Sequence, residues 1–98
     1  MRVVTPRKLR EFSELHAKAK IPLLNWYEVV KNANWQNFAE MRQSINSVDY
    51  VGNNRYVFNI GGNHYRLIAI IIFASQKLYI RFIGTHAEYD DLKDVSEV

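Results

Sequence analysis

The chain has 98 residues, 48% of them hydrophobic, which suits one small folded domain and excludes a disordered protein. It has no cysteine and no run of eighteen apolar residues, which excludes disulfides, thiolate metal sites and a membrane-spanning helix. The net charge is +3 and no apolar leader follows Met1, so we expect a single domain over residues 1–98, in the cytoplasm and without a membrane partner.

The N-terminal part has a strand pattern followed by a helix pattern. Residues 1–4 alternate weakly, as a short strand does. Thr5 as N-cap and Pro6 at the first helical position then predict a helix that runs to about Lys18. The residues expected to face inward on this helix are Leu9, Phe12, Leu15 and Ala19, and its other side carries Arg7, Lys8, Arg10 and Lys18.

Two further helices are predicted before residue 46. The first of them begins near Pro22, and we interpret its apolar positions as core and not as a stacking surface: Leu23, Trp26, Tyr27 and Val30. Asn37 and Glu40 have the spacing of a capping box, with Asn in place of Ser or Thr. They predict a short helix that buries Phe38, Met41 and Ile45.

After Asn46 the pattern changes to strands and turns. Residues 55–60, 63–73 and 77–84 read as three strands, and a Gly-Asn-Asn turn precedes the first. Gly61-Gly62 is the signal of a two-residue hairpin, and Ser75-Gln76 turns the chain again. Thr85 and Glu88 have the spacing of a capping box, which predicts a short C-terminal helix.

Hairpin geometry decides which side chains share a face of the predicted sheet. With Gly61 and Gly62 central in the turn, Phe58 pairs with Tyr65 and Val57 with Arg66. One face is then almost wholly apolar and packs on the helices: Tyr56, Phe58, Ile60, Tyr65, Leu67 and Ala69. With Ser75 and Gln76 central in the next turn, Ile70 pairs with Arg81. The opposite face then carries the cations Arg55, His64, Arg66 and Arg81.

The charges of the chain favour a polyanion as ligand for this cationic face. Between Asp49 and Glu88 there is no acidic residue, and residues 1–85 hold twelve Lys or Arg against five Asp or Glu. Arg66 and Arg81 lie mid-strand with no carboxylate nearby in sequence, which favours ligand binding over a structural ion pair. Arg55 is equally compatible with ordinary surface, and a pI near 9.3 is also compatible with solubility alone.

His86 and Tyr89 lie three residues apart on the predicted C-terminal helix and so project from one side of it. Arg, His and Tyr suffice for RNA cleavage in which the ribose 2′-OH attacks the adjacent phosphate. Such a reaction excludes DNA as substrate. The acidic gap argues against Mg²⁺, so we expect no metal and no cofactor. A lone histidine at a helix start is more often incidental than functional, but the neighbouring Tyr89 and the arginines bring the two interpretations of His86 level.

Three segments carry a resemblance to a known family: residues 50–63 (YVGNNRYVFNIGGN), 65–67 (YRL) and 79–90 (YIRFIGTHAEYD). They resemble the HigB toxins of type II toxin–antitoxin systems, within the RelE/ParE-like superfamily, and the resemblance extends over essentially the whole chain. It implies an α+β, RelE-like fold, with N-terminal helices packed on one face of a small, mainly antiparallel sheet. It also implies an endoribonuclease that cleaves mRNA in the ribosomal A site, with the ribosome and a HigA-type helix-turn-helix antitoxin as partners.

By this similarity the active site would consist of Arg66, Arg81, His86 and Tyr89. Arg66 and Arg81 would hold the scissile phosphate, and His86 and Tyr89 would divide the roles of base and acid in an order the sequence leaves open. Further RNA contacts would come from Arg55, His64, Lys77, Arg7, Lys8 and Arg10. The three on the first helix are equally compatible with a solvated helix face. A non-catalytic RNA-binding module and a ParE-like gyrase poison are the alternatives.

Overall fold

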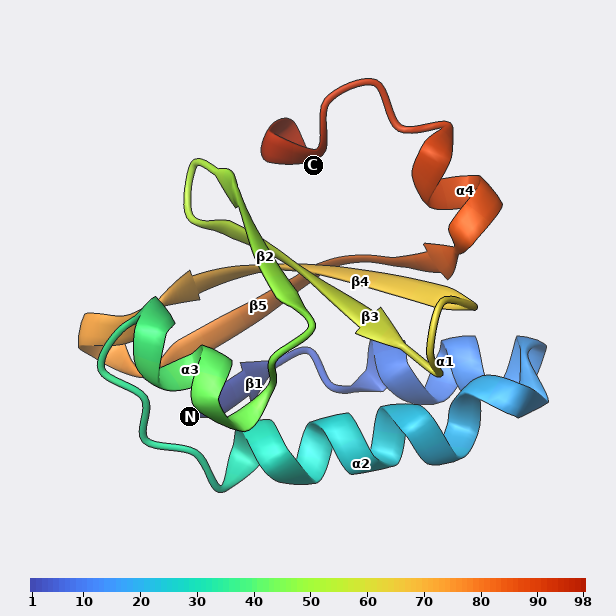
Figure 1. Cartoon of the computed structure of the whole chain (residues 1–98). Coiled ribbons are helices and arrows are strands. Elements are labelled where there is room, and N and C mark those ends of the chain that lie inside the picture. The colour runs from blue at the N-terminus through green and yellow to red at the C-terminus, as the bar shows by residue number, and fades with distance from the viewer.

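The computed structural model describes residues 1–98 and has a five-stranded sheet at its centre (Figure 1). The strands lie in the order β1-β5-β4-β3-β2, with β1 parallel to β5 and all other neighbours antiparallel. Their bounds are β1 Arg2–Val4, β2 Val48–Gly52, β3 Arg55–Ile60, β4 Tyr65–Ile72 and β5 Lys77–Thr85. The predicted α+β class is confirmed.

The helices divide between the two faces of this sheet. Those on one face are α1 Arg7–Leu15, α2 Lys20–Lys31 and α3 Phe38–Ser44, whereas α4 His86–Asp90 and the segment after it lie on the other (Figure 1). We call the face that carries α4 the outer face. Short 3₁₀ turns are Ala17–Ala19, Phe73–Ser75 and Val95–Glu97. None of the helices combines the length and apolarity needed to cross a membrane.

The main core fills the space between the sheet and the first three helices. Phe58 and Leu67 on the sheet are fully buried, and Trp26 of α2 meets the Phe58 ring edge-on at 5.3 Å between ring centroids. Burying such a side chain contributes about 2–3 kcal/mol, so this layer fixes the sheet against α2. All six residues predicted for the apolar face belong to this core.

The predicted two-residue hairpin at Gly61-Gly62 is wrong. Ile60 pairs with Tyr65 and not with Asn63, so residues 61–64 form a four-residue loop. Both glycines have positive φ, and Gly61 O accepts from His64 N at 3.3 Å, which closes the longer turn. The register error is two residues, and since strand side chains alternate with period two, the predicted faces are nevertheless correct.

The predicted pairing of Ile70 with Arg81 is also wrong, because Ile70 pairs with Tyr79. The 3₁₀ turn Phe73–Ser75 and the left-handed Gln76, whose φ is 55°, make a four-residue connection between Ile72 and Lys77, which is longer than the predicted Ser-Gln hairpin. Further along, a β-bulge leaves Arg81 without its own partner on β4, between Ile80 and Phe82. Arg81 lies two residues from Tyr79 and therefore shares the outer face with it, as predicted.

The first helix departs from prediction at both ends. Thr5 has a φ of 63° and its side chain makes no capping hydrogen bond, so Pro6 takes the N-cap position and the helix begins at Arg7. It ends at Leu15 and not near Lys18, because the non-helical backbone of His16, with φ of −130° and ψ of 87°, interrupts it. Leu15 is 82% exposed and not inward-facing; it lines a shallow hollow with Lys8 and with Phe82 of β5.

Two capping boxes were predicted, and one is complete. Thr85 Oγ1 accepts from Glu88 N at 3.2 Å, and Glu88 Oε1 accepts from Thr85 N at 2.8 Å. These two reciprocal hydrogen bonds complete the capping box and hold the first turn of α4. Asn37 caps α3 by accepting from Glu40 N at 2.9 Å. The carboxylate of Glu40 accepts instead from Gln36 N, one residue earlier than a capping box requires.

Candidate active site

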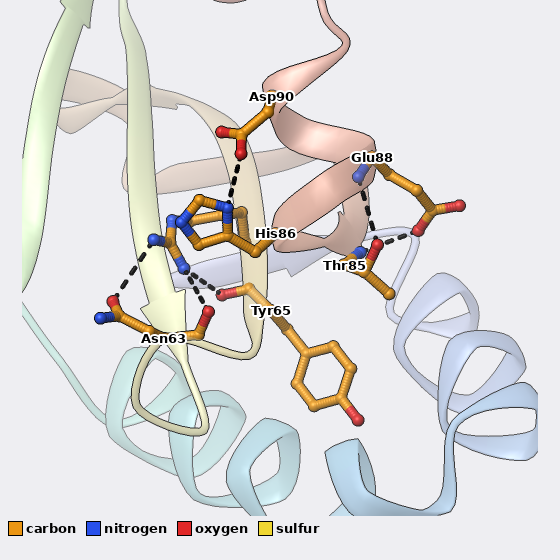
Figure 2. Close-up of polar contacts among 7 residues, drawn as sticks. Asn63, Tyr65, Thr85, His86, Glu88 and Asp90 are labelled. Carbon is orange, nitrogen blue, oxygen red and sulfur yellow. Dashed lines mark hydrogen bonds and ion pairs between the residues drawn. The ribbon is translucent and has the colours of Figure 1, made fainter.

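Arg66 is the only buried charged residue, with 9% of its surface exposed. It lies on β4 between Asn59 of β3 and Gly84 of β5. Its Nη1 donates to the main-chain oxygens of Asn63 and Tyr65, both at 3.2 Å, and its Nη2 donates to Asn63 Oδ1 at 3.3 Å (Figure 2). No carboxylate lies within ion-pair distance of it, so its positive charge is not neutralised by the protein.

The capping box at Thr85 brings α4 to this arginine. Thr85 pairs with Tyr65, and His86 N donates to His64 O at 3.1 Å, so α4 begins beside the start of β4. Tyr89, on the first full turn of α4, then lies beside Arg66, with 5.8 Å between the guanidinium carbon and the ring centroid. Three of the predicted site residues, Arg66, His86 and Tyr89, therefore lie where α4 meets the start of β4, which we call the α4 corner of the outer face.

His86 is oriented by a carboxylate that the sequence analysis did not single out. Its Nδ1 lies 2.8 Å from Asp90 Oδ2, one helical turn later (Figure 2). The pair is about half exposed, and it leaves Nε2 as the ring nitrogen available to a ligand. The i, i+4 spacing of His and Asp on a predicted helix was the signal that could have found it. Asn63, the partner of Arg66, had no such signal, because its position depends on the four-residue loop.

Arg55 and Arg81 form a second group on the outer face. Arg55 donates from Nε and Nη2 to the main-chain oxygen of Val98 at 3.1 and 2.9 Å, and Arg81 donates to it from Nε at 3.3 Å. The three arginines thus share one face, but Arg66 contacts the α4 corner whereas the other two converge on the C-terminal segment. Within that segment, hydrogen bonds from the Ser96 hydroxyl and main-chain N–H lower the pKa of Asp94.

The remaining predicted RNA contacts are dispersed. His64 is exposed in the loop before β4. Lys8 donates to Ile80 O at 3.4 Å and shares a shallow hollow of about 340 Å³ with Arg81. Lys77 lies at the opposite end of β5, about 26 Å of strand from Thr85. Arg7 and Arg10 line a separate groove of about 480 Å³ between α1 and α2, away from the outer face.

Candidate metal ligands do not gather anywhere in the chain. No three His, Asp or Glu side chains lie close enough together to share an ion. The polar groups at the α4 corner are a guanidinium, an imidazole with its carboxylate, a phenol and an amide. These groups can bind an oxyanion and transfer protons.

The α+β fold is consistent with a RelE-like protein, and a family model described as the RelE-like toxic component of a toxin–antitoxin system matches residues 19–92. The chain belongs to the HigB toxin family. It is similar to the mRNA interferase toxin HigB of Escherichia coli K12, with 32% identity over 92% of this chain and 88% of the relative. The mRNA interferase HigB of Shigella flexneri gives the same values, and that of E. coli O6:H1 is 30% identical over 94% and 91%. Family membership implies an antitoxin partner.

Proposed function

We propose that this toxin is an mRNA endoribonuclease whose active site comprises Arg66, Arg81, His86 and Tyr89. The observation that carries the proposal is the buried, unneutralised guanidinium of Arg66 beside Tyr89 and near the start of α4. A buried cation without a carboxylate partner is costly for a protein to keep, unless a ligand supplies the negative charge. An RNA phosphate supplies it, and three relatives of the chain are named mRNA interferases.

The reaction that fits these groups uses the ribose 2′-OH as nucleophile. One of the pair His86 Nε2 and Tyr89 Oη takes the 2′ proton while the oxygen attacks phosphorus. The bond from phosphorus to the 5′-oxygen breaks, and the other group of the pair protonates that oxygen. Arg66 and Arg81 stabilise the charge that accumulates on the phosphoryl oxygens. The products are a 2′,3′-cyclic phosphate and a 5′-hydroxyl, and no metal takes part.

Asn63 and Asp90 act as positioning residues for this chemistry. Asn63 holds the guanidinium of Arg66 through two acceptors, and Asp90 fixes which ring nitrogen of His86 faces the substrate. Arg55, His64 and Lys8 extend the cationic surface along the RNA. Lys77, Arg7 and Arg10 lie too far from the α4 corner to contact the same nucleotides, so they would meet other parts of a large RNA partner.

The biological setting that we propose follows the family. The toxin acts in the cytoplasm on mRNA in the ribosomal A site, and a HigA-type helix-turn-helix antitoxin neutralises it. Binding at the A site would give the exposed cations on α1 a ribosomal RNA surface to contact.

The proposal is tested with His86→Ala and Tyr89→Phe in a translation extract supplied with one mRNA. We expect each variant to fold, to retain RNA binding and to lose cleavage by about 10²-fold or more, since each removes one proton-transfer group. Wild-type cleavage in both variants would mean that the reaction is carried out elsewhere on the protein.

A further inference from the structure

The segment after α4 folds back across the outer face of the sheet. Residues 92–98, which we call the strap, run from the end of α4 towards the hairpin between β2 and β3 (Figure 1). Asn53, in that hairpin, donates from Nδ2 to Ser96 O and to Glu97 Oε1, both at 3.1 Å. The strap is therefore fastened to the sheet by side-chain contacts between residues more than forty positions apart.

The end of the strap lies on the two arginines of the second cationic group. Three N–H donors, two from Arg55 and one from Arg81, converge on the single oxygen of Val98 at 2.9–3.3 Å. Convergent guanidinium donors of this kind are the arrangement that proteins use for phosphate oxygens. Arg81 uses only Nε for this contact, so its two terminal nitrogens remain free to reach a second phosphate.

The outer face beneath α4 and the strap is buried, although the main core lies on the other side of the sheet. Val57 and Ile68 pair across β3 and β4 on the outer face and are 4% and 0% exposed, yet neither belongs to the main core cluster. In Figure 1, α4 and the strap are the elements on this side of the sheet. The strap and α4 thus act as a cover over the outer face.

We propose that Arg55 and Arg81 form a phosphate subsite beside the Arg66 corner, and that the strap occupies this subsite until an RNA phosphate displaces it. The inference rests on the proposed function, since it places the RNA backbone on the outer face. A phosphate group presents several anionic oxygens to the two arginines, whereas the strap presents the single oxygen of Val98, so a phosphate can engage more of their donors. RNA then binds only those molecules in which the strap is open. The apparent affinity for RNA is therefore the intrinsic affinity multiplied by the open fraction.

A disulfide that locks the strap tests this directly. A Cβ built on Gly52 lies 3.6 Å from Ser96 Cβ, within the range that a disulfide spans, and the chain has no cysteine of its own. Gly52→Cys with Ser96→Cys therefore gives one protein with a locked and a released state. The φ of +100° at Gly52 strains any side chain there, and comparison of the oxidised with the reduced form of the same protein cancels that strain.

The readout is the affinity for a short RNA made resistant to cleavage by 2′-deoxy substitution. We expect the reduced form to bind at least about tenfold more tightly than the oxidised form, with wild type insensitive to reductant. Equal affinity of the two forms would overturn the strap proposal and leave the proposed nuclease function standing. If neither form binds the free RNA, the nuclease proposal is unaffected, because it places the mRNA on the ribosome. In that case the strap proposal is decided by the binding of inorganic pyrophosphate, followed by NMR at the Arg55 and Arg81 Nε–H groups. The affinities of the oxidised and the reduced form are compared as before.

A second pair of variants needs no disulfide. Asn53→Gly removes the side-chain amide that holds the strap. Glycine tolerates the φ of 51° at this position, so the backbone is not strained. Asn54→Gly is the matched control, because its φ is 63° and its side chain makes no hydrogen bond to the strap. We expect Asn53→Gly to bind RNA or pyrophosphate more tightly than Asn54→Gly by about threefold or more. Equal binding by the two variants would contradict the proposal.

Discussion

Replacing Arg66 by alanine separates a catalytic from a structural role for the buried guanidinium. The substitution removes three hydrogen bonds, to Asn63 O, Asn63 Oδ1 and Tyr65 O, and it also removes the cost of keeping a charge at 9% exposure. These effects oppose each other, so we expect a loss of about 1–2 kcal/mol in the free energy of unfolding. In a domain of this size that lowers Tm by about 4–16 °C.

The expected loss of cleavage is larger than this loss of stability can explain. A domain with about 5 kcal/mol of stability keeps about 3 kcal/mol in the variant, so about 99% of the molecules stay folded. Removing one preorganised cation from a developing oxyanion costs about 10²–10³ in rate. The assay is single-turnover cleavage of mRNA, with the folded fraction measured by urea unfolding under the same conditions.

Two matched variants complete the test of Arg66. Arg66→Lys keeps the charge but cannot donate to all three acceptors while it binds a phosphate, so we expect cleavage to stay at least about tenfold below wild type. Lys31→Ala removes an exposed cation from the end of α2, on the other face of the sheet, and should leave cleavage nearly unchanged. Cleavage by Arg66→Ala within threefold of wild type would refute the reasoning and make Arg66 a structural residue.

Three further outcomes are expected. Asp90→Asn should lower cleavage about tenfold with little change in Tm, because the half-exposed contact between Asp90 and His86 orients the imidazole but contributes little stability; an equal fall in Tm and activity would contradict this. Thr85→Ala removes the N-cap of α4 and should cost about 1 kcal/mol in urea unfolding and lower cleavage, whereas unchanged unfolding would show that the box is dispensable. Burial, with a smaller contribution from Tyr50, raises the pKa of Tyr56 above 10.0. The folded state therefore keeps the Tyr56 proton at pH values where the unfolded state has lost it. The contribution of Tyr56 to the free energy of unfolding is complete below pH 10 and is lost as pH rises further. Urea unfolding at pH 9 and pH 11 should show a smaller alkaline loss in Tyr56→Phe than in wild type.

The strand pattern allowed the outer face to be predicted, although both hairpins were placed in the wrong register. The error around Gly61 was two residues, and a period of two returns every side chain to the same face. The start of α4 was predicted because Thr85 and Glu88 form a local motif whose bonds join residues three apart. Local signals of this kind are sufficient to place His86 and Tyr89 on one helix.

The features that the sequence analysis missed depend on contacts between distant residues. The bond between Asn53 and Glu97 and the convergence of Arg55 on Val98 join positions more than forty residues apart, so no local pattern encodes them. The bulge at Arg81 adds one residue to a strand whose alternation gives no sign of it. Leu15 was predicted to face inward from the helical period, but it lies exposed in a surface hollow beside Phe82 and outside the core.

The chemistry of the RNA ends tests the central proposal most directly. One mRNA is incubated with the toxin in a translation extract, and the new ends are identified by mass spectrometry, with a matched mRNA that carries a 2′-O-methyl group at the cleavage position. Attack by the 2′-OH predicts a 2′,3′-cyclic phosphate and a 5′-hydroxyl, and no cleavage at the methylated position. A 5′-phosphate with a free 3′-hydroxyl, or cleavage at the methylated position, would contradict the mechanism built on Arg66, Arg81, His86 and Tyr89.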